Sequence, residues 1–150
     1  MIHDDLDRHL AAAGAIDRAA APLGMYLAWC TNLQLISDEL AGEHGRLVLR
    51  GRYREITGAE LLVGACAGEL ADRHLNDEGR RFTAFYLPRY LDDFRATFGT
   101  DPYAVPDDWV HYDLIAPHLT RELMAFRKNH TAGGSKVIGR TDQRWWRRGR

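Results

Sequence analysis

The chain has 150 residues, of which 45% are hydrophobic and 27% charged, and its formal net charge is −1 at pH 7. This length suits one domain with a substantial core. No apolar run approaches the roughly 20 residues needed to cross a bilayer, and the N-terminal stretch MIHDDLDRHL is too acidic and polar for a signal peptide. We therefore expect a cytoplasmic protein with no membrane partner.

The first predicted elements are a short polar helix over residues 3–14 and, within the stretch 22–40, a central core helix followed by a tight exit. The central segment, PLGMYLAWCTNLQLISDEL, has apolar residues at helical spacing on more than one face, which indicates a buried helix. Pro22 suits the first helical position, where a missing N–H costs nothing. Ser37 is placed to cap the turn that follows. Trp29 is expected to lie between helices.

The middle of the chain is ambiguous only at residues 46–54, RLVLRGRYR, which fit either a short helix or an alternating strand. A helix is favoured because no clear strand partner is found elsewhere. The following sequence Thr57-Gly58-Ala59-Glu60 has the capping-box pattern and predicts a helix whose apolar stripe runs on to Leu70.

A long helix is predicted from about Asn76 to Phe98, with Pro88 inside it and Gly99 at its end. Its aromatic stripe could line a ligand pocket, but such a stripe is more often plain core. The stripe consists of Phe82, Tyr86, Tyr90 and Phe94. A short turn over 109–115 and a last helix from Pro117 follow, and then a flexible loop from His130 to Gly139.

These elements predict an all-α protein, an irregular single-domain bundle of five to seven helices. Residues 1–130 would form the helical domain, and residues 131–150 a flexible loop with a basic tail rich in Trp and Arg. The two cysteines, Cys30 and Cys66, lie on apolar helical stripes and are interpreted as reduced core residues.

Charge is distributed unevenly along the chain. Residues 1–135 contain 20 acidic and 14 Lys or Arg residues, whereas residues 136–150 contain six Lys or Arg residues and Asp142 as their one acid. An acidic body and a basic tail can attract each other, or each can serve a different partner.

One cluster could support chemistry: His111, Asp113 and His118 are residue types that ligate metals. Their spacing matches no strong metal motif, and phosphate-binding, dinucleotide-binding and nucleophile-elbow motifs are absent. The simpler interpretation is that Trp109 and its neighbours pack under a turn. The sequence therefore assigns no catalytic, cofactor-binding or metal-binding residue, and no cofactor.

The tail offers a different kind of site, because Trp145 and Trp146 lie among arginines. Such a segment could stack on bases and pair with phosphates, or it could dock into a protein groove. The acidic body argues against nucleic acid and favours a self-docked tail or a protein partner; exchange of tails between two copies would make a homodimer. The candidate partner-binding residues are Arg144, Trp145, Trp146, Arg147, Arg148, Trp109, His111 and Asp113.

Four segments carry a family resemblance: PLGMYLAWCTNLQLISDEL, REITGAELL, LNDEGRRF and WVHYDLIAPHL, in this order. Over roughly Ala20 to Phe126 the chain resembles an uncharacterised family of small helical bacterial proteins, a domain of unknown function. Some members are loosely associated with toxin–immunity loci. The resemblance implies no catalytic residues.

The leading hypothesis is a non-enzymatic protein-binding module, most plausibly an immunity protein that neutralises a bacterial toxin by direct binding. An acidic surface can fill a basic cleft made for nucleic acid or a nucleotide. Two alternatives stay open: a hydrolase or metal-dependent enzyme that uses the His111, Asp113 and His118 region, and nucleic-acid binding through the basic tail.

Overall fold

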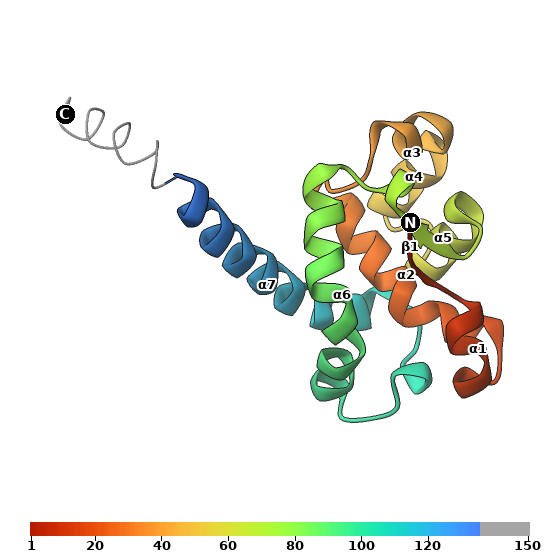
Figure 1. Cartoon of the computed structure of the whole chain (residues 1–150). Helices are drawn as coiled ribbons and strands as arrows, with labels where there is room; N and C mark the ends of the chain where they lie inside the picture. Colours follow the sequence, from red (N-terminus) through yellow and green to blue (C-terminus); the bar gives the residue numbers. More distant parts are fainter. Residues whose placement is uncertain (136–150) are drawn as a thin grey trace. The chain divides into compact units, whose positions relative to one another are not determined.

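The computed structural model in Figure 1 describes residues 1–135, and the described residues are almost entirely helical. They fall into two compact units, Met1–Pro117 and a second unit that begins at His118. The predicted all-α class is confirmed, with one small two-stranded sheet added. The elements in chain order are β1 (Ile2–Asp5), α1 (Asp7–Ala13), α2 (Ile16–Asn32), α3 (Asp38–Glu43), α4 (Gly45–Arg52), α5 (Gly58–Cys66), β2 (Glu69–Ala71), η1 (Asp72–His74), α6 (Asp77–Phe98), η2 (Pro102–Ala104) and α7 (Trp109–Ser135).

Helix α2 is the buried centre of the first unit, as the sequence predicts, and Trp29 is fully buried within it. The helix begins at Ile16, however, so that Pro22 lies inside it and not at its start. The alanine-rich stretch before Pro22 explains the difference, because alanine has the highest helix propensity and these small side chains are buried. The carbonyl oxygen of Pro22 accepts a hydrogen bond of 2.6 Å from the Tyr90 hydroxyl.

Helix α5 packs directly against α2, and two glycines make the contact as close as it is. A Cβ atom on Gly24 would lie 2.4 Å from the Ala59 nitrogen, and one on Gly58 would lie 2.3 Å from the Gly24 carbonyl oxygen. The predicted capping box starts α5: the Thr57 N–H donates to Glu60 Oε1 at 2.9 Å, and the Glu60 N–H donates to Thr57 Oγ1 at 3.2 Å.

The aromatic stripe of α6 is core, as the simpler interpretation holds. All four of its rings are at most 2% exposed, and neighbouring rings along the helix lie 5.3–6.3 Å apart. The buried hydroxyls have partners: Tyr86 donates to Asp93 at 2.8 Å, and Tyr90 donates to Pro22. Pro88 lies inside α6, and Gly99 ends it with a positive φ of 68°, both as predicted.

The prediction of a helix over residues 3–14 is wrong in its first part, where the chain forms β1 before α1 begins. Strand β1 pairs antiparallel with β2, which takes Leu70 out of the predicted helical stripe. The Leu6 N–H continues the contact by donating to the Gly68 carbonyl at 3.0 Å. Strands this short are stabilised by pairing with each other and by packing against the rest of the fold. Local sequence patterns do not predict such contacts.

The predicted break before Pro117 is also wrong, because α7 is one helix from Trp109 to Ser135 with Pro117 inside it. A proline in a helix removes one backbone hydrogen bond, and the helix continues despite that loss. The helix also covers residues 130–135, where the sequence pattern predicts a loop. Residues 136–150, which include the rest of that loop and the basic tail, lie outside the described residues.

The two cysteines are free and buried, as predicted. Burial raises the pKa of the Cys66 thiol to about 12 and raises that of Cys30 as well, so neither forms a thiolate near neutral pH. Among the described residues, the helices are all too short or too polar to cross a membrane.

Replacing Trp29 with alanine is expected to lower the free energy of unfolding by about 3–5 kcal/mol, because it deletes a large, fully buried aromatic side chain. Urea denaturation followed by circular dichroism measures the change. A loss below about 1 kcal/mol would contradict the central position of α2.

A second stability prediction concerns the contact between α2 and α5. Gly24→Ala should cost about 3 kcal/mol, because the added methyl group meets backbone atoms that cannot rotate away. Gly42→Ala is the matched control: it lies in α3 with no atom within 4 Å of the new Cβ, and should stabilise by about 0.5–1 kcal/mol. Equal effects of the two substitutions would show that the helices have room to separate.

Candidate functional site

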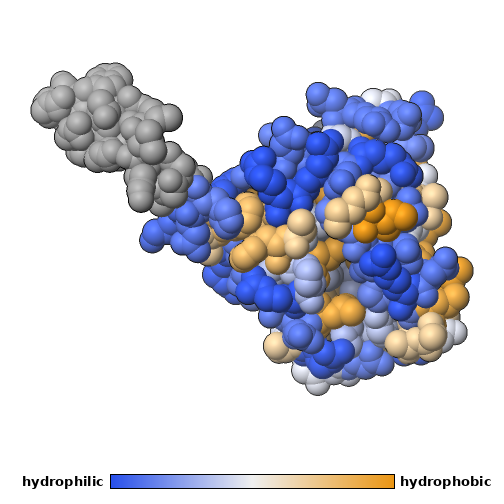
Figure 2. Space-filling view, in the orientation of Figure 1, coloured by the Kyte–Doolittle hydropathy of each residue, from blue (hydrophilic) through white to orange (hydrophobic). Residues whose placement is uncertain are grey.

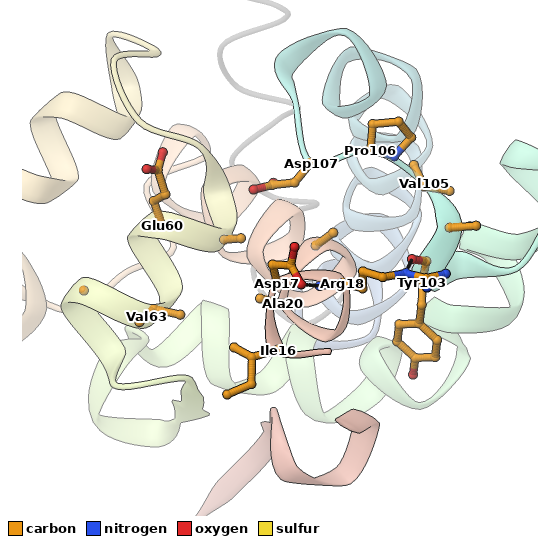
Figure 3. A pocket seen from close by; sticks show the side chains of 14 residues that line it. Ile16, Asp17, Arg18, Ala20, Glu60, Val63, Tyr103, Val105, Pro106 and Asp107 are labelled. Atoms are coloured by element: carbon orange, nitrogen blue, oxygen red, sulfur yellow. Dashed lines mark hydrogen bonds between the residues drawn. The ribbon is translucent and has the colours of Figure 1, made fainter. Parts of the chain in front are cut away.

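The first unit carries a groove of about 680 Å³, which we call the acidic groove. Figure 3 shows α5 on one side, residues 103–107 on the other and the start of α2 between them. The volume is within the range of about 300–1,000 Å³ that is typical of ligand pockets. The lining residues are Ile16, Asp17, Arg18, Ala20, Ala21, Ala59, Glu60, Val63, Gly64, Tyr103, Ala104, Val105, Pro106 and Asp107.

The two helices leave apolar side chains exposed in the acidic groove. Val63 is 49% exposed and Ile16 is 58% exposed, although both are aliphatic. Val63 is exposed because α5 buries its opposite face, with Leu61, Leu62 and Cys66 at most 2% exposed. Figure 2 shows such apolar patches among hydrophilic side chains on the surface of the molecule. An apolar surface bordered by polar groups is typical of binding sites.

The wall formed by residues 103–107 is fixed from two sides. On the groove side, Arg18 Nε donates to the carbonyl oxygen of Tyr103 at 3.0 Å. Behind the wall, the Tyr103 hydroxyl is hydrogen-bonded to His9 Nδ1, and His9 Nε2 is 2.7 Å from Asp4 Oδ2. Since the Asp4 carboxylate accepts, His9 Nε2 is the donor in that hydrogen bond. The groove is therefore held open by polar contacts from β1, α1 and α2.

Three carboxyl groups and one guanidinium group set the charge of the acidic groove: Asp17, Glu60 and Asp107 against Arg18. Burial raises the pKa of Asp107, and the neighbouring carboxylate of Glu60 adds to the rise. Hydrogen bonds from the Thr57 hydroxyl and the Ala59 N–H partly offset it. The groove therefore offers an unfavourable place for further negative charge and a favourable one for a cation.

The polar groups that line the acidic groove are mostly engaged in hydrogen bonds within the protein. The lining contains no serine, cysteine or histidine, and the Tyr103 hydroxyl is already hydrogen-bonded to His9. Glu60 and Asp107 both accept hydrogen bonds at the N-terminus of α5, from Thr57 and Ala59 respectively. A carboxylate that caps a helix is poorly placed to exchange protons with a substrate. The acidic groove thus combines apolar side chains with carboxyl groups that can contact a ligand.

The structure brings the sequence-predicted residues of α7 together with Arg54 and not with the acidic groove. Both oxygens of Asp113 accept from Arg54, at 2.9 and 2.6 Å, and the guanidinium carbon lies 4.9 Å from the centre of the Trp109 ring. This ion pair lowers the pKa of Asp113. His111 Nδ1 lies 2.6 Å from Asp108 Oδ1. Asp113 and His111 thus each have a partner of their own, whereas the buried Trp109 Nε1 at the start of α7 has no hydrogen-bond partner among the described residues.

The remaining predicted residues cannot be placed in this site. His118 belongs to the second unit, so no arrangement with His111 and Asp113 is described. The tail residues lie outside the described part of the chain; they are Arg144, Trp145, Trp146, Arg147 and Arg148. Their role in partner binding stays a prediction.

The residues that form the acidic groove have no distinctive pattern in the sequence. Glu60 is predicted only as half of a capping box, and no site role is predicted for Asp107. Val63 could have indicated a binding surface, because it is an aliphatic residue that falls outside the buried stripe of α5. Nothing local indicates that Asp107 approaches Ala59, 48 positions earlier in the chain.

Comparison with known proteins gives a family without an assigned activity. The family described as a domain of unknown function (DUF7832) matches residues 2–105. The chain belongs to this family, and the matched region includes α2, α5 and η2, which form most of the acidic groove. No curated protein and no solved structure matches the chain.

The raised pKa of Asp107 predicts a pH-dependent contribution to stability. Because the folded state favours the protonated carboxyl, the contribution is present below the unfolded pKa of about 3.9 and is lost as the pH rises through the higher folded pKa. Asp107→Asn keeps an acceptor for the Ala59 N–H and does not titrate.

The wild-type protein should therefore lose stability relative to Asp107→Asn between about pH 3 and pH 7. Urea denaturation of both proteins across this range measures the difference, in which the titration of other carboxylates cancels. A wild-type protein that gains stability relative to the variant as the pH rises would contradict the burial of this carboxyl.

Proposed function

We propose that this chain is a non-enzymatic cytoplasmic module that binds another protein, and that the acidic groove is where the partner docks. The observation that carries the proposal is an open groove of about 680 Å³ that combines exposed Ile16 and Val63 with three carboxyl groups. Exposed apolar surface supplies affinity, and the charges select the partner and orient it.

The partner that fits this groove presents an apolar side chain next to basic groups. A toxin that acts on nucleic acid or nucleotides has such a basic surface, because it must attract phosphates. In its finer form, therefore, the proposal is that the chain acts as an immunity protein and neutralises a toxin by covering that surface. Shape and charge complementarity are sufficient for this role, and no catalytic group is needed.

Co-expression tests the proposal directly. The product of a toxin-like gene encoded next to this one is expressed with the wild-type chain, with Val63→Lys or with Val110→Lys, and growth is measured. Wild type should restore growth. Val63→Lys should not, because a lysine there would extend over the groove and neutralise Glu60 one turn away.

Val110→Lys is the matched control, since Val110 is a 70% exposed valine on α7 that does not line the groove. It should restore growth as wild type does. Equal rescue by both lysine variants would show that the partner docks elsewhere. If wild type neither restores growth nor co-purifies with the toxin-like protein, toxin neutralisation is excluded.

A further inference from the structure

The acidic groove continues into two smaller hollows that share its lining residues. One, of about 300 Å³, shares Ile16 and Val63 with the groove, and the other, of about 240 Å³, shares Val63 and Gly64. The two smaller hollows also share Ala67 with each other. The three hollows therefore surround the exposed face of α5, which we call the α5 surface.

The α5 surface is lined by an excess of carboxylates. The smaller hollows add Asp5, Asp7 and Glu69 on one side and Glu39 and Glu43 on the other to the three of the groove. Arg18 and Arg73 are the arginines that line the three hollows. Such a set of like charges attracts a polycation much more strongly than a single carboxylate does.

Most of these carboxylates have no basic partner among residues 1–130. Asp5 pairs with Arg8 at 3.7 Å, and Glu69 with Arg73 at 3.4 Å. The other six, Asp7, Asp17, Glu39, Glu43, Glu60 and Asp107, form no ion pair among these described residues. The charges of the α5 surface are thus available to a ligand.

We propose that the α5 surface binds an extended, basic segment of the partner protein in which arginine or lysine alternates with large apolar residues. This inference rests on the proposed protein-binding function and names the part of the partner that is recognised. In an extended segment successive side chains point to opposite faces, so the apolar side chains would enter the hollows beside Val63, and the long arginine or lysine side chains would reach back to the carboxylates at the rim. From Glu60 to Cys66, α5 rises by about 9 Å, a length that about three extended residues cover at about 3.3 Å each.

The probe is a synthetic peptide of the sequence RLRWRLR carrying a fluorescent label, with ELEWELE as its charge-reversed control. Fluorescence anisotropy with the full chain should detect the basic peptide and not the acidic one. Binding should weaken by about tenfold between roughly 20 and 200 mM salt, because exposed charges are screened. Equal binding of both peptides, or binding insensitive to salt, would overturn the proposal.

Two variants localise the peptide. Val63→Lys should weaken binding by about tenfold or more and Val110→Lys should leave it unchanged. If Val63→Lys does not fold, Glu39→Gln combined with Glu43→Gln removes two charges from exposed positions of α3 and should weaken binding at low salt by about threefold.

The matched control for that pair is Asp77→Asn combined with Asp92→Asn, which removes two exposed carboxylates from α6. This control should bind the peptide about as tightly as wild type does. In heteronuclear NMR spectra, the peptide should shift the amide signals of Val63, Gly64 and Ala67. Shifts of amide signals confined to other parts of the chain would contradict the placement of the peptide on the α5 surface.

A last experiment tests whether the α5 surface is occupied by a partner protein or by the chain's own basic segment at 144–148. In the full chain, Trp145→Ala combined with Trp146→Ala should leave the affinity for the peptide unchanged. A gain in affinity of about tenfold would show that this segment already competes for the α5 surface, and the segment would then replace the partner protein as the occupant.

The two proposals can fail separately. Growth rescue without peptide binding would refute this inference alone, whereas loss of growth rescue with peptide binding intact would refute toxin neutralisation.

Discussion

The close contact between α2 and α5 is the constraint on which the rest of the first unit depends. Gly24 and Gly58 meet with so little space that any Cβ atom would overlap backbone of the facing helix. Their contact fixes which face of α5 is buried, and so it also fixes which face is left outside. The exposed stripe from Glu60 through Val63 to Ala67 is therefore a direct consequence of two glycines in the core.

The groove is formed where a third segment closes against these two helices. Residues 103–107 are held by Arg18 from α2 and by a hydrogen-bonded chain through His9 to Asp4. This explains why the short sheet matters to a site that it does not line: β1 carries Asp4, and its pairing with β2 places that carboxylate behind the wall. Packing and polar contacts together make an apolar hollow with a charged rim.

The sequence predicts the elements better than it predicts the site. Capping residues Ser37, Thr57 and Asn76 begin helices as expected, because a cap depends on neighbours three residues away. The strands and the helical positions of Pro22 and Pro117 were not predicted, because long-range packing overrides local preference there. Groove residues such as Asp107 and Glu60 are ordinary in sequence and become a site only when the fold brings them together.

The capping role of the groove carboxylates links ligand binding to the stability of α5. Asp107 is shifted toward its neutral form by burial, yet only its ionised form makes the strongest bonds with the Ala59 N–H. A cationic group bound in the groove would favour the ionised form and strengthen the cap. A basic partner would therefore bind and rigidify the N-terminus of α5 in one step. An anionic ligand would be repelled by the carboxylates of the groove and would also disfavour the ionised form of Asp107 that caps α5. Under the proposed function, this coupling would let the acidic groove distinguish ligands by their charge.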